Sequence, residues 1–221
     1  HADDGVPSQE YFSYYHLDSA RQKGYTGKGV TIALIDAGVN TSEPALKGAN
    51  VTDKSRCTVD TNAEGTRHAT EMATILVSPY TGVAPDATLY SYQSTNSGTQ
   101  SGGTCAANGA ELNSTGALIN QAVEDGAQII SISQSDSDNS TEIKWAIANA
   151  VSRGVIIVAS VGNNATDENS RHLSRWSGVV GVSAINSDGT FASYSSWGNG
   201  VVTAAIGGPF KSDDPSTNQP T

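Results

Sequence analysis

Basic residues are scarce in this sequence of 221 residues, where 12 lysines and arginines stand against 22 aspartates and glutamates, a formal net charge of −10. This balance argues against nucleic acid or an anionic membrane surface as a partner, because both repel an acidic protein. It indicates a solvated acidic surface with a mild preference for neutral or cationic ligands. Long apolar runs are also missing, so we predict no membrane span, and the first residues carry no signal-peptide pattern.

Cysteine is equally sparse. The two cysteines, Cys57 and Cys105, lie in polar stretches rich in glycine, serine and threonine, with no histidine beside them. Two such cysteines predict one disulfide in an exported protein rather than a metal site, with two free thiols as the alternative. We therefore expect a secreted or cell-surface protein without a metal or cofactor.

The apolar run 31–36 is typical of a strand buried on both faces, as in a parallel sheet. Further strands and amphipathic helices follow it in alternation, an order that predicts one α/β domain over residues 1–221. Its three layers would be a mainly parallel, twisted sheet and helices on both faces. The expected strands are 31–36, 88–92, 129–133, 155–161, 179–185 and 201–206, and the expected helices are 8–22, 67–77, 114–124 and 141–152.

Three polar residues fall where such a fold builds sites. Asp36 ends the first strand, His68 lies in the first turn of the helix 67–77, and Asn163 follows the strand 155–161. A helix start disfavours the charged imidazolium, which suits a base. In acyl transfer an aspartate orients a histidine base and an amide stabilises the oxyanion. A turn or N-cap role for Asp36, and a structural or exposed His68, are the alternatives.

Five motifs follow one another along the chain: GYTGKGV leading to LIDAG (24–38), HAT (68–70), GVAPDATLY (82–90), ASVGN (159–163) and FASYSSWG (191–198). In this order they resemble those of the subtilisin-like serine proteases, from Gly24 to Gly207. Ala37 stands where the family usually has threonine or serine, and Ala69 stands where it usually has glycine. The resemblance implies a subtilisin-like fold that hydrolyses peptide or protein substrates and is matured by proteolytic processing. It also implies that Asp36 orients His68, that His68 acts as general base and then acid, and that Asn163 donates to the oxyanion.

The same resemblance implies where a peptide substrate lies. One segment corresponds to the exposed strand edge that pairs with the substrate backbone, and another to the opposite wall of the first specificity pocket. The family usually has an apolar residue and a glycine at Gln134 and Ser135, so we expect a narrower or more polar pocket. The two segments are Ser133, Gln134 and Ser135, and Ser160, Val161 and Gly162.

The family's calcium-binding loop, inserted in the histidine helix, has no counterpart here, because that helix continues directly towards Gly82. We predict that this calcium site is absent. Scattered carboxylates at Asp53, Asp60 and Glu64 could form another site but are more typical of a solvated loop. A nucleotide site is disfavoured, because no glycine-rich phosphate loop follows the first strand.

The nucleophilic serine of the family, carried by a Gly-Thr-Ser motif, is not found in this sequence. Ser195 and Ser196 occupy a turn that the family uses structurally. We expect a separate C-terminal companion segment, produced by cleavage, to carry the serine. The alternative is an inactive pseudoprotease that binds peptides or a protein partner.

Overall fold

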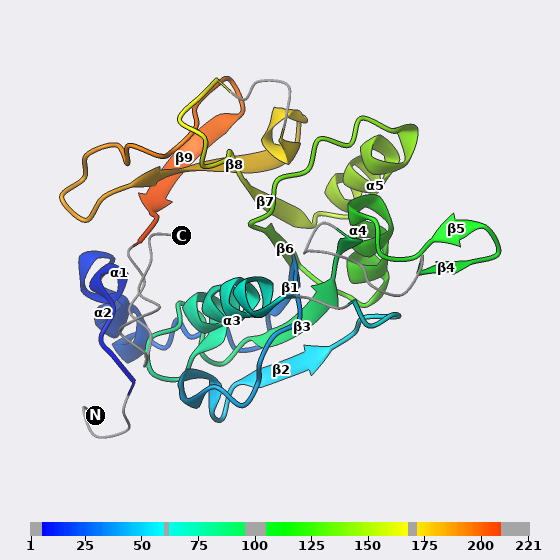
Figure 1. The fold of residues 1–221 in the computed structure, drawn as a ribbon. Coiled ribbons are helices and arrows are strands. Elements are labelled where there is room, and N and C mark those ends of the chain that lie inside the picture. Colours follow the sequence, from blue (N-terminus) through cyan, green and yellow to red (C-terminus); the bar gives the residue numbers. More distant parts are fainter. Residues whose placement is uncertain (1–5, 60–61, 96–104, 168–171, 209–221) are drawn as a thin grey trace.

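The computed structural model describes residues 6–59, 62–95, 105–167 and 172–208 (Figure 1). Seven strands form one sheet in the order β2-β3-β1-β6-β7-β8-β9, and every neighbouring pair is parallel. The carboxyl ends of all seven strands therefore lie at one edge. They are β1 (Thr31–Asp36), β2 (Asn50–Asp53), β3 (Thr88–Gln93), β6 (Ile129–Ile132), β7 (Ile156–Ser160), β8 (Val179–Ile185) and β9 (Val201–Ile206).

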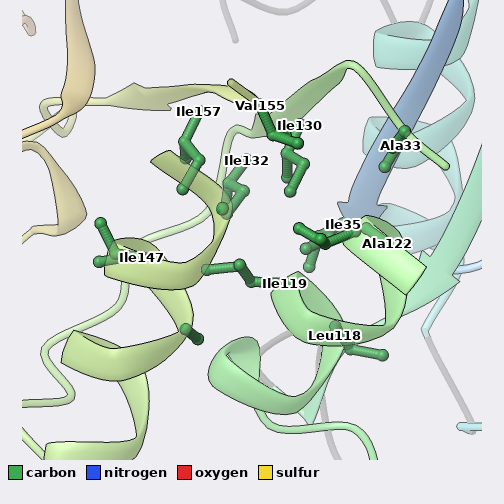
Figure 2. Close-up of a cluster of buried hydrophobic side chains, with 14 of the residues drawn as sticks. Ala33, Ile35, Leu118, Ile119, Ala122, Ile130, Ile132, Ile147, Val155 and Ile157 are labelled. Carbon is green, nitrogen blue, oxygen red and sulfur yellow. The ribbon is translucent and has the colours of Figure 1, made fainter. Parts of the chain in front are cut away.

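Helices cover both faces of the sheet, which confirms the predicted three-layer α/β architecture. Alternate residues of β1 separate the two cores, because successive side chains of a strand point to opposite faces. Ala33 and Ile35 pack with α4 (Thr115–Glu124) and α5 (Thr141–Ser152), as Figure 2 shows. Ile32 and Leu34 pack instead with α3 (Ala63–Val77) on the other face.

The N-terminal helix predicted over 8–22 is wrong as one element, because it forms two short helices, α1 (Glu10–Tyr14) and α2 (Leu17–Gln22). Between them His16 adopts a left-handed conformation with φ of 53°, which an uninterrupted helix cannot accommodate. The pattern also missed the strand pair β4 (Ala106–Ala107) and β5 (Ala110–Glu111), whose strands are too short to show a period.

Helix α3 begins four residues earlier than the predicted start at Arg67. Asn62 caps it, since its side-chain oxygen accepts a hydrogen bond of 2.7 Å from the backbone N–H of Gly65. The apolar period begins only later in the helix, which explains the late prediction. His68 therefore lies in the second turn of α3 and not in the first.

A disulfide joins Cys57 to Cys105, with their Cα atoms 5.9 Å apart, as the sequence predicts. It links the segment after β2 to the β4–β5 hairpin. Short 3₁₀ helices at Pro44–Leu46 and Leu173–Arg175 complete the described elements. In the part of the chain that the structure describes, no helix combines the length and apolarity needed to cross a bilayer.

Candidate active site

Strand register aligns the candidate residues along the carboxyl edge of the sheet. Leu34 of β1 pairs with Ser131 of β6, which in turn pairs with Val158 of β7. Two residues after these positions, β1 ends at Asp36 and β7 ends at Ser160, and Ser133 directly follows the end of β6. The three segments that the sequence singled out therefore begin side by side, on three consecutive strands.

The side chains of Asp36 and His68 are in contact. The Nδ1 atom of His68 lies 3.1 Å from Oδ1 and 3.0 Å from Oδ2 of Asp36. Asp36 is 1% exposed, and its Oδ1 also accepts a hydrogen bond of 2.7 Å from the backbone N–H of Ala37. The His68 side chain is 29% exposed. Asp36 therefore holds the ring at Nδ1, while part of the ring remains accessible to solvent.

Burial is the largest effect on the pKa of His68 and lowers it, but the hydrogen bond and charge of Asp36, with a smaller contribution from Glu71, raise it above 6.5. The sequence analysis placed His68 in the first turn of the helix, where the charged imidazolium is disfavoured, and this placement is wrong. His68 lies one turn further into α3 than expected, where the free N–H groups of the helix start no longer face it.

Helix α3 carries a second ion pair beside His68. Arg67 and Glu71 lie four residues apart and pair through Nη1 and Oε1. Burial raises the pKa of Glu71, while the charge of Arg67 lowers it. The hydroxyl of Thr70 accepts a hydrogen bond of 2.9 Å from the backbone N–H of Asn40, which ties the loop after Asp36 to the helix that carries His68.

The two segments assigned to substrate binding follow neighbouring strands. Residues 133–135 come after β6, and Ser160 ends β7, where its Oγ accepts a hydrogen bond of 3.0 Å from the N–H of Gly162. Gln134 is half-buried and Ser135 is exposed, whereas Val161 and Gly162 are buried. The register thus brings both segments to the same edge as Asp36.

Gln134 has a contact that sequence reasoning missed. Its Nε2 lies 3.5 Å from Oδ1 of Asp36, so the carboxylate faces an amide as well as an imidazole. The sequence feature that could have indicated this contact is the amide of Gln134, because the family that the sequence resembles usually has an apolar side chain at this position. Ser94 also donates its backbone N–H to the carbonyl of Asp36 at 2.8 Å, which extends the parallel pairing of β1 and β3.

Asn163 follows β7, the second strand beyond β1, and its side chain is exposed. Before it, Gly162 has a φ of 104°, and a Cβ atom there would lie 2.5 Å from Nε2 of the buried His172. Only glycine fits both the backbone angle and this close approach. The turn into Asn163 therefore packs against the buried side chain of His172, a residue that the sequence analysis did not single out.

Ser195 and Ser196 are buried, and their hydroxyls accept hydrogen bonds from backbone N–H groups. The Ser195 hydroxyl accepts from the N–H of Ala184 at 2.9 Å, and the Ser196 hydroxyl accepts from the N–H of Asn164 at 3.1 Å. Within the described ranges, no serine hydroxyl is hydrogen-bonded to His68. The geometry thus gives both serines structural partners, as the sequence analysis expected.

The carboxylates considered for a metal are dispersed. Asp53 accepts hydrogen bonds from the N–H of Ser55 at 2.8 Å and from Nε2 of Gln93 at 3.2 Å, and Glu64 is exposed near the start of α3. Asp60 lies outside the described residues. Among the described residues, no group of three or more histidines, cysteines or carboxylates is arranged to hold a metal ion. Helix α3 runs without interruption to Val77.

Sequence comparisons identify similar proteins over most of the chain. Residues 27–218 match the profile described as the Subtilase family. The chain is 28% identical to Subtilisin DY of Bacillus licheniformis, an alignment of 90% of this chain and 72% of that protein. It is 31% identical to Subtilisin E of Bacillus subtilis (84% and 48%) and 34% identical to the Minor extracellular protease Vpr of Bacillus subtilis (88% and 25%). The chain thus spans about half or less of the last two proteins.

Solved structures share the fold. A mutant form of the protease domain of PatA superposes with a TM-score of 0.70 at 22% identity, covering 83% of this chain and 69% of that one. A cold adapted subtilisin-like serine proteinase gives a TM-score of 0.66 at 24% identity, with 85% and 66% covered.

Proposed function

This chain belongs to the subtilase family, and from that premise we propose that the complete protein is a serine endopeptidase with Asp36 and His68 in its catalytic triad. The observation that carries the proposal is the contact of a buried carboxylate with Nδ1 of a partly exposed imidazole. A carboxylate at Nδ1 fixes the tautomer in which Nε2 is free to accept a proton.

In the proposed reaction, Nε2 of His68 removes the proton of a serine hydroxyl while the serine oxygen attacks the peptide carbonyl carbon. The Asp36 carboxylate stabilises the imidazolium that forms, and the side-chain amide of Asn163 donates to the oxyanion. His68 then protonates the departing amine as the tetrahedral intermediate collapses to an acyl-enzyme. Water attacks the acyl-enzyme by the same steps and releases the acid.

We place the nucleophilic serine on a C-terminal companion segment outside the 221 residues. The proposal is supported by the sheet face under α3, which is covered by apolar packing over only some of its strands. The apolar cluster under α3 contains residues of β1, β3 and β6 but, in the described part of the chain, none of β7, β8 or β9. On this face Ile156 of β7 is 51% exposed, and apolar sheet surface of this kind is usually covered. A helix carrying the serine would fill that space.

We propose that substrates bind as an added strand at the carboxyl edge, between residues 133–135 and residues 160–162. Backbone groups would supply affinity, and side-chain pockets would supply selectivity. Gln134 and Ser135 make this edge more polar than an apolar residue and a glycine would. The disulfide, and the extracellular location in the name of the relative Vpr, support export of the protein.

The test is labelling of the purified complete protein with a fluorophosphonate probe, which reacts with an activated serine. We expect label on a band that carries the serine, and loss of that label in His68→Ala. His16→Ala, a change of an exposed histidine outside the site, should leave labelling intact. Absence of label in the unaltered protein, together with binding of unhydrolysed peptide, would favour the pseudoprotease.

A further inference from the structure

The loop that carries Asn163 is held in an unusual backbone conformation. Gly162 on one side has a φ of 104°, and Ala165 on the other has a φ of 51°, a left-handed angle that is uncommon for alanine. Within the described residues, Asn163 itself makes no hydrogen bond through its backbone or side chain. Its orientation must therefore be imposed through its neighbours.

The turn 192–197 supplies that support from the adjacent part of the chain. Four hydrogen bonds join the turn to the loop, two donated by the turn and two donated by the loop. They run from Ser196 N to Gly162 O (2.8 Å), from Asn164 N to Ser196 Oγ (3.1 Å), from Ala165 N to Tyr194 O (2.9 Å) and from Trp197 N to Thr166 O (3.1 Å).

Ser196 holds both neighbours of Asn163. Its backbone N–H binds the carbonyl before Asn163, and its hydroxyl binds the N–H after it. Ser196 is 0% exposed, so its hydroxyl is shielded from water that could replace this hydrogen bond. His172 fills the space beside Gly162, where a Cβ atom would lie 2.5 Å from its Nε2.

From this geometry we infer that Ser196 is a positioning residue, which sets the direction of the Asn163 side chain towards the oxyanion. The inference rests on the proposed peptidase function and assigns a role to a residue outside the triad. An oxyanion donor stabilises the transition state only when it is held in place before the reaction, and a displacement of about 1 Å costs on the order of a hundredfold in rate. Ser196 acts through backbone groups and touches no reacting atom.

Ser195 offers a matched control in the same turn. It is equally buried, and its hydroxyl also bonds to backbone, accepting from Ala184 N at 2.9 Å and donating to Ser196 O at 3.1 Å. The first bond holds the turn to β8, the second stays within the turn, and neither reaches the Asn163 loop. Ser195→Ala therefore removes the same group from the same environment without releasing Asn164.

The experiment is a double-mutant cycle in the complete protein, with kcat and KM measured on a peptide substrate. We expect Asn163→Ala to lower kcat about a hundredfold. Ser196→Ala should lower kcat about tenfold with little change in KM, because the donor is misdirected but still present. Ser195→Ala should change kcat less than about twofold. In the Asn163→Ala background, Ser196→Ala should have no further effect on kcat, since no donor is left to position.

Equal fractional losses from Ser196→Ala with and without Asn163 would overturn the positioning role, and so would an equal loss of kcat in Ser195→Ala. Full activity of Asn163→Ala would instead overturn the proposed oxyanion donor, and the inference with it. If Ser196→Ala does not fold, Ser196→Cys keeps the shape of the side chain, with a larger atom in place of the oxygen, and weakens the acceptor. The same cycle run with that variant then supports or overturns the inference.

Discussion

At the scale of single residues, two opposing effects set the pKa of His68. Burial lowers it, because the charged imidazolium loses solvation, and the nearby Asp36 carboxylate raises it, because it stabilises that charge. The net direction is upward, so the hydrogen bond and charge of Asp36, together with the charge of Glu71, outweigh burial. A base with a raised pKa is protonated, and therefore inactive, over a wider range of acidic pH.

Asp36→Asn should reverse this shift. Removing the carboxylate leaves burial as the largest remaining effect, so the pKa of His68 should fall from above 6.5 to below it. NMR titration of the His68 ring in both proteins measures this directly, and it requires no activity. In the unaltered enzyme the acid limb of kcat/KM should lie above pH 6.5. A pKa that does not fall in Asp36→Asn would contradict the assigned pair.

At the scale of elements, the disulfide anchors the segment that supports the carboxyl end of β3, the strand beside Asp36. Lys54 N donates to Ser91 O at 2.9 Å, Gln93 N donates to Ser55 Oγ at 2.8 Å, and Val59 N donates to Gln93 Oε1 at 3.0 Å. Gln93 pairs in register with Asp36 itself. The disulfide therefore links the segment that makes these contacts covalently to Cys105, which directly precedes the β4–β5 hairpin.

Replacing both cysteines with serine should lower the free energy of unfolding. The bridge closes a loop with a sequence separation of 48 residues, and loop-closure entropy gives a loss of about 4 kcal/mol for a loop of this length. Urea unfolding of both proteins measures the difference. As a control, a reducing agent should destabilise the unaltered protein and leave the double variant unchanged. Equal unfolding midpoints would contradict a structural role for the bridge.

At the scale of the whole molecule, the net charge of −10 acts on every ligand that approaches. An acidic surface raises the local concentration of cationic peptides and repels anionic ones, and salt screens both effects. This field influences the rate of association and not the fold. It would complement the polar edge that we propose for substrate binding at Gln134 and Ser135, which would act only at contact.

Two peptides that differ only in a distant lysine or glutamine test this effect. We expect kcat/KM for the lysine peptide to fall several-fold as salt rises from about 20 to about 200 mM, with little change for the glutamine peptide. The ratio of the two values at each salt concentration removes effects of salt on the enzyme itself. An equal salt dependence for both peptides would exclude electrostatic attraction of the substrate.

The fold class, the family and the position of most strands could be predicted from the sequence. Buried parallel strands are continuous apolar runs, and strand ends such as Asp36 and Asn163 stand out where those runs stop. The two cysteines in polar loops were enough to predict the bridge. Short or broken elements, such as β4, β5 and the kink at His16, escaped because their conformation depends on backbone angles and not on a repeating pattern.

How the candidate residues meet depends on contacts that exist only in the folded protein. The Asn62 cap starts α3 before Arg67, so His68 lies in the second turn and not at the free N–H groups of the helix start. There Asp36 contacts His68, and the pKa of His68 is raised. The contact of Gln134 with Asp36, and the support of the Asn163 loop by Ser196, join residues distant in sequence. Local patterns cannot reveal such pairs, because their energies arise from burial and hydrogen bonds that exist only after the sheet has formed.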